Sequence, residues 1–92
     1  MFSAEQLENI DPRYFNIITT DVYNVTIMRR NTGHIWYIHN SEYLGEGSCI
    51  IFHKHRASEL YHQHGKSRTL RQALKNIQKH DQWQMGGRKR RK

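Results

Sequence analysis

One amphipathic α-helix constrains the fold of this chain more than any other feature. Its apolar side chains recur at the spacing of a single helix face, and they belong to Leu70, Ala73, Leu74 and Ile77. Thr69 and Gln72 have capping-box spacing at its start, so we expect a helix over residues 69–80. A helix with one apolar face must pack on another apolar surface, which the remaining residues have to supply.

The residues before this helix are typical of β-strands. Residues 14–40 are rich in β-branched and aromatic side chains and show no helical spacing. Gly33, within RNTGH, suits a tight turn, and the apolar side chains of residues 35–38 would point to both faces, as in a central strand. We expect a loop over residues 40–48. Residues 49–55 and 60–64 predict a second hairpin that turns at residues 56–59.

A shorter helix is predicted near the N-terminus. Ser3 and Gln6 have capping-box spacing, which predicts a helix over residues 4–9, and Pro12 ends it because the residue before a proline avoids the helical conformation. The sequence therefore predicts a single α+β domain over residues 1–83. It would contain the short helix, an antiparallel sheet of four or five strands, and the C-terminal helix packed on one sheet face. Residues 84–92 are expected to form a disordered basic tail.

Positive charge is concentrated in the last third of the chain. Residues 1–65 hold five Lys and Arg against seven acids, a net charge of −2, whereas residues 66–92 hold ten against one, a net charge of +9. Such segregation indicates a surface for an anionic partner, and we expect DNA or RNA contacted through its phosphates. The candidate nucleic-acid-binding residues are Lys66, Arg68, Arg71, Lys75, Lys79, Arg88, Lys89, Arg90, Arg91 and Lys92.

Base stacking is a further element of this hypothesis. Aromatic side chains can stack on unpaired bases, and the candidates are Trp36, Tyr37, Tyr43, Tyr61 and Trp83. Sequence-specific reading is not indicated, because the chain has no helix-turn-helix spacing, zinc-finger pattern or basic region with heptads.

Other interpretations of the charge remain open. The basic helix face can simply be solvated, and the tail can attract a membrane surface or serve as a nuclear-localisation signal. A different class of function is a protein–protein interaction module, such as a phage or mobile-element accessory or inhibitor that binds a host enzyme. Its interface would then combine exposed tyrosines with Glu42, Glu46 and Glu59.

Four histidines in two His-x-His pairs form a second candidate site. If the hairpin is symmetric about Ala57 and Ser58, position 53 lies opposite 62 and position 51 opposite 64. One sheet face would then present four imidazoles able to hold Zn²⁺ or Cu²⁺, those of His53, His55, His62 and His64. An odd loop would move one pair to the other face.

The same histidines allow two further interpretations. They can be polar strand residues without a ligand, or a histidine pair can perform acid–base cleavage of RNA. Our leading interpretation is a non-enzymatic protein that needs no cofactor and has no catalytic residues, with a metal-dependent or histidine-based ribonuclease as a third hypothesis.

The remaining features concern location. Cys49 is the only cysteine, so an internal disulfide is excluded, and this fits a reducing compartment. The first residues carry acids and no apolar segment, unlike a signal peptide, and the longest apolar run, residues 49–52, is too short to span a membrane. We expect a cytoplasmic protein, or a nuclear one in a eukaryotic host.

Under a third of the chain resembles a known family. Residues 47–52, His64-Gly65 and residues 69–75 are similar to parts of small toxin ribonucleases of the HicA type, in which a Gly-Ser-His sequence on a strand precedes a closing helix. Cys49 stands where that resemblance implies a catalytic histidine, and residues 14–40 have no counterpart. The sequence alone therefore assigns the chain to no family.

Overall fold

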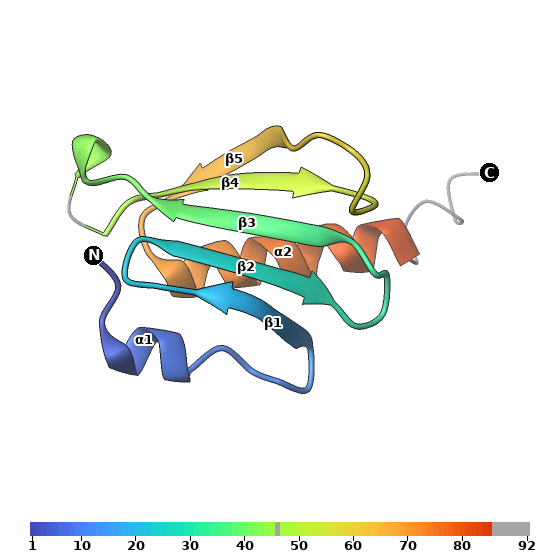
Figure 1. The fold of residues 1–92 in the computed structure, drawn as a ribbon, viewed down its shortest axis with the longest axis horizontal. Coiled ribbons are helices and arrows are strands. Elements are labelled where there is room, and N and C mark those ends of the chain that lie inside the picture. The colour runs from blue at the N-terminus through green and yellow to red at the C-terminus, as the bar shows by residue number, and fades with distance from the viewer. Residues whose placement is uncertain (46, 86–92) are drawn as a thin grey trace.

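The computed structural model describes residues 1–45 and 47–85 (Figure 1). Within them the chain forms a five-stranded sheet, two α-helices and a short 3₁₀-helix. In chain order the elements are α1 (Ala4–Glu8), β1 (Phe15–Thr20), β2 (Asn24–Arg29), β3 (Ile35–Asn40), η1 (Glu42–Leu44), β4 (Cys49–Lys54), β5 (His62–Ser67) and α2 (Leu70–Met85).

The strands follow one another across the sheet in chain order, β1-β2-β3-β4-β5, and each pairs antiparallel with the next. Helix α2 runs along one face of this sheet, and no described helix covers the face toward the viewer in Figure 1. The predicted α+β architecture is confirmed. Strand β3 is the middle strand, as its apolar side chains indicated, with Trp36 fully buried and Tyr37 half-buried.

The hydrophobic core lies between the sheet and α2. Side chains from the inner strands are fully buried there, including Val25, Ile27, Trp36, Ile38 and Ile51. The predicted helix stripe meets them, since Leu70, Ala73 and Ile77 are buried and Leu74 is partly buried against the same cluster. Burial of each large side chain contributes about 1.5–3 kcal/mol, so this contact explains why the chain closes as two layers.

The N-terminal helix α1 begins with the predicted capping box. Ser3 Oγ accepts a hydrogen bond from the Gln6 backbone N–H at 3.1 Å, and Gln6 Oε1 accepts one from the Ser3 backbone N–H at 2.8 Å. The helix ends at Glu8, one residue before the predicted end. Phe2 and Ile10 flank it and are both buried, which attaches the segment to the core.

Helix α2 has the predicted start but a later end. Thr69 Oγ1 accepts from the Gln72 backbone N–H at 3.1 Å, whereas Gln72 Oε1 accepts from the N–H of Arg68 at 3.1 Å and not from that of Thr69. The helix continues to Met85, beyond the predicted residue 80, because residues 81–85 contain no Gly or Pro. Residues 84 and 85, expected in the tail, are thus helical, and residues 86–92 lie outside the described part of the chain.

Among the described residues, no helix combines the length and the apolar composition that crossing a membrane requires.

Candidate functional site

The hairpin of β4 and β5 determines where the four predicted histidines lie. His53 pairs with His62, as predicted, because the loop between the strands has the even length that symmetry about Ala57 and Ser58 requires. Beyond this pair the register changes, since Phe52 pairs with Gln63 but Ile51 pairs with Gly65. The predicted pairing of Ile51 with His64 is therefore wrong, because His64 is the extra residue of a β-bulge.

The four histidines nevertheless gather on the sheet face that α2 covers. His53 is only 2% exposed, and its ring stacks on that of buried Trp36 with the centroids 3.9 Å apart and the planes 18° from parallel. The His55, His62 and His64 rings lie 4.9, 5.3 and 6.0 Å from the His53 ring, and all three residues are exposed. The sequence-based prediction of one histidine face is correct.

Two more histidines belong to this cluster, although the sequence analysis did not include them. His34, in the turn before β3, has its ring 5.1 Å from that of His53, and His80 of α2 has its ring 5.5 Å from it. Both positions follow local patterns that could have revealed them. His34 precedes Trp36 by two, the strand period, and His80 follows Ile77 by three, the helix period.

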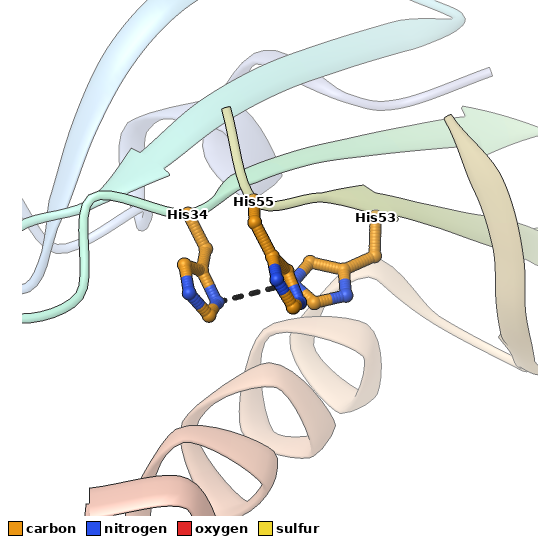
Figure 2. Close-up of side chains that lie close together, drawn as sticks. All are labelled: His34, His53 and His55. Carbon is orange, nitrogen blue, oxygen red and sulfur yellow. Dashed lines mark hydrogen bonds between the residues drawn. The ribbon is translucent and has the colours of Figure 1, made fainter. Parts of the chain in front are cut away.

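The cluster contains two sets of three histidines whose ring nitrogens lie within 4.8 Å of one another. One set is His34, His53 and His55, and the other is His53, His64 and His80. In the first set, His34 Nδ1 and His53 Nε2 are 3.2 Å apart and hydrogen-bonded, as Figure 2 shows. The His34 and His55 rings are stacked at 4.2 Å with planes 10° apart.

Burial keeps the central imidazoles neutral. The pKa of His53 is lowered to about 3, first by burial and then by the neighbouring His34, His55, His80 and His62. Burial also lowers the pKa of His64, with His80 and His62 adding to the effect. A neutral imidazole has a free lone pair on one ring nitrogen, so these residues are in the protonation state that metal coordination requires.

The cations of the predicted nucleic-acid surface are divided between two faces. Lys66 pairs with Ile50, whose side chain is on the face opposite buried Ile51, so Lys66 belongs to the open face of the sheet. The predicted end of this strand at residue 64 is wrong, because β5 extends to Ser67, and the strand period therefore directs the side chain of Lys66. Arg68 is exposed in the link between β5 and α2.

Three of the candidate cations form a row on helix α2 itself. Arg71, Lys75 and Lys79 of α2 are all exposed. Arg71 also lines an open groove of about 490 Å³ between α1 and α2, which Glu5 lines as well. The tail candidates Arg88, Lys89, Arg90, Arg91 and Lys92 lie outside the described residues.

The open sheet face carries a group of aromatic rings. The Tyr37 ring centroid is 5.5 Å from that of Phe52 and 5.8 Å from that of Tyr61. Lys54 Nζ lies 4.3 Å from the Tyr61 ring centroid, and Lys66 shares this face. Of the predicted stacking candidates, Tyr37 and Tyr61 are thus brought together, Trp36 is buried and cannot stack on a base, and Tyr43 is exposed on η1.

No known protein family, curated protein or solved structure matches the chain. The arguments for function therefore come from these side chains alone.

Proposed function

We propose that this protein binds nucleic acid through the phosphates and catalyses no reaction on it. The observation that carries the proposal is the row of exposed cations along α2, Arg71, Lys75 and Lys79, opposite the helix face that packs on the sheet. They are spaced four residues apart, which separates them by about 6 Å along the helix and suits successive phosphates of a strand.

Among residues 1–45 and 47–80, whose side chains the structure describes, the ion pairs that join the N-terminus to Glu42, Arg13 to Asp11 and Arg56 to Glu59 do not involve the three helix cations. Like charges four residues apart destabilise a helix by about 0.2–0.5 kcal/mol per pair, and phosphates would relieve that repulsion. The tail cations of residues 88–92 would add phosphate contacts and counterion release.

The open sheet face favours a single strand as the ligand. Unpaired bases stack on aromatic side chains, and the Tyr37, Phe52 and Tyr61 rings lie beside Lys54 and Lys66. This face is on the other side of the sheet from α2, so the two surfaces can be tested separately.

The proposal leaves out catalysis by His53 for a physical reason. An efficient general acid or base at neutral pH has a pKa near 7, and the pKa of His53, at the centre of the cluster, is about 3. A labelled RNA incubated with the protein should remain intact, and histidine-dependent cleavage would favour the ribonuclease hypothesis instead. Nucleic-acid binding agrees with the cytoplasmic location expected from the sequence.

The test is fluorescence anisotropy with labelled duplex DNA, single-stranded DNA and single-stranded RNA over a range of salt concentrations. The helix variant is Arg71→Gln/Lys75→Gln/Lys79→Gln, in which glutamine preserves helix propensity. Lys54→Gln/Lys66→Gln tests the open face separately, because it removes the two cations beside the aromatic rings there. Affinity falls with salt, and each phosphate contact removed should make the slope of log affinity against log salt less steep by about 0.7 on a single strand and about 0.9 on a duplex. For the three substitutions of the helix variant, the slope should become less steep by about 2–3 in total.

Binding that weakens with salt and loses this slope in the helix variant supports the proposal. A loss confined to Lys54→Gln/Lys66→Gln would place the docking surface on the open sheet face and contradict the helix cations as the phosphate site. Absence of salt-dependent binding by the full chain would contradict nucleic-acid binding altogether. A salt-insensitive protein partner would then become the better hypothesis, with exposed Tyr43, Leu60 and the edge strand β1 as the surface to examine.

A further inference from the structure

We propose that His34, His53 and His55 form a binding site for one Zn²⁺ ion, with a fourth coordination position open to solvent. This function is independent of nucleic-acid binding by α2. The site lies at the end of the sheet where the turn before β3 meets the end of β4 (Figure 2).

The separation of two of the donor atoms fits zinc. Zinc bound by imidazole has Zn–N distances of about 2.0–2.1 Å in tetrahedral geometry, which places two ligand nitrogens about 3.3 Å apart. His34 Nδ1 and His53 Nε2 are 3.2 Å apart, so their separation suits one shared ion, toward which both nitrogens would have to turn from their present hydrogen bond. The bound ion would replace the hydrogen bond that now joins them.

His53 is held in place before any ion arrives. It is almost completely buried, and its ring is stacked on Trp36. A ligand whose orientation is fixed by packing loses little conformational freedom when the metal binds.

The other two ligands are positioned by their backbones. The His34 carbonyl accepts a hydrogen bond from the Arg29 N–H at 2.9 Å, and the His34 N–H donates to Thr32 Oγ1 at 3.2 Å. The His55 N–H donates to Glu59 Oε1 at 2.9 Å. Hydrogen bonds within its own turn therefore hold the backbone of each of these two histidines.

His55 is the ligand that has to move. Its ring is stacked parallel to that of His34, so both cannot direct a nitrogen at one ion without a side-chain rotation. His55 is exposed, and such a rotation is inexpensive for an exposed side chain. Its ligand nitrogen already lies within 4.8 Å of the other two.

Three neutral imidazoles leave the full double charge on the ion. Imidazole suits zinc, copper and nickel, and zinc adapts best because it has no electronic preference for geometry. With three protein ligands, the fourth position would be taken by water or by an anion, as in zinc sites that remain open.

The test is calorimetric titration of the full chain with Zn²⁺ after removal of metal with EDTA. Three exposed histidines allow matched variants that should not disturb folding, and circular dichroism would check this. His55→Ala changes the proposed site, His64→Ala changes the neighbouring set of three, and His62→Ala changes neither set. The wild type should bind one Zn²⁺ per chain. His55→Ala should weaken binding by at least about 10–100-fold, the effect of removing even an outer-shell partner of a metal ligand, while the other two variants should retain it.

Three results would overturn the assignment. The first is the absence of stoichiometric binding by the wild type. The second is binding lost in His64→Ala but retained in His55→Ala, which would place the ion in the other histidine set. The third is an equal, small loss in all three variants, which would mean nonspecific chelation by surface histidines.

Discussion

Lowering the pH from 7 to 5 should destabilise the folded protein, and His53 should account for about 2 kcal/mol of the loss. The pKa of His53 is about 3 in the folded protein and 6.5 in its ordinary, unfolded environment. Above pH 6.5 this imidazole is neutral in both states and its titration contributes nothing. Below pH 6.5 the unfolded chain binds a proton that the folded state excludes, so the free energy of unfolding falls by up to about 1.4 kcal/mol per pH unit. The loss is complete near pH 3, where the folded state also takes up the proton.

The assay is urea denaturation at pH 7 and pH 5 in EDTA, followed by circular dichroism. His53→Gln removes the titrating group and should lower stability at both pH values, because it also removes the ring stacked on Trp36. The test is the difference between the free energy of unfolding at pH 7 and that at pH 5. This difference should be smaller by about 2 kcal/mol in His53→Gln than in the wild type. His39→Gln is the control, since His39 lies on the opposite sheet face, within hydrogen-bonding distance of Asn24. If the free energy of unfolding of His53→Gln changes as much between pH 7 and pH 5 as that of the wild type, the reasoning is refuted.

Two further predictions concern the packing that supports the site. Ile77→Ala, in the buried face of α2, should cost about 3 kcal/mol, seen as a lower urea midpoint with an unchanged slope, and a loss under about 1 kcal/mol would contradict the burial of that face. Gly47→Ala should cost more than Gly33→Ala in the same assay. Gly47 and Gly33 have positive φ angles of +80° and +76°, a conformation that costs an alanine about 1–2 kcal/mol at either position. Only at Gly47 would the added Cβ also lie 3.3 Å from the Arg68 carbonyl oxygen. Equal costs would show that this close approach is not important.

The helix and its packing could be predicted from the sequence because their signals are local. The stripe of α2 and the Thr69 cap depend on residues within two turns of one another, and the structure has both. The end of α2 could not be predicted in the same way. Residues 81–85 lie past the apolar stripe, and only the absence of a helix breaker in them indicates that the helix continues.

The histidine site was predicted only in part. Strand alternation and an even loop correctly place His53 opposite His62, but alternation cannot anticipate the bulge at His64, for which Gly65 was the available signal. His34 and His80 join the cluster through tertiary packing between segments that lie far apart in the sequence. They could be found only by extending the strand and helix periods from Trp36 and Ile77 to the neighbouring polar positions.

Lys66 shows how the predicted end of one strand affects a candidate binding surface. The strand was predicted to end at residue 64, and Lys66 was grouped with the candidate cations of the helix and the tail. Because β5 continues to Ser67, Lys66 takes its direction from the strand and belongs to the aromatic face. The error was small in sequence but moved a charge to the other side of the sheet.

The chain-order arrangement of the strands has a consequence for the protein during its synthesis. Each of β2 to β5 emerges from the ribosome next to a partner that has already been made, so the sheet can grow one hairpin at a time with short loop closures. Helix α2 comes last among the described elements, and until it docks, Trp36, Ile38 and Ile51 face water. A nascent chain that pauses before residue 70 therefore exposes apolar side chains that only α2 covers, which makes it prone to aggregation.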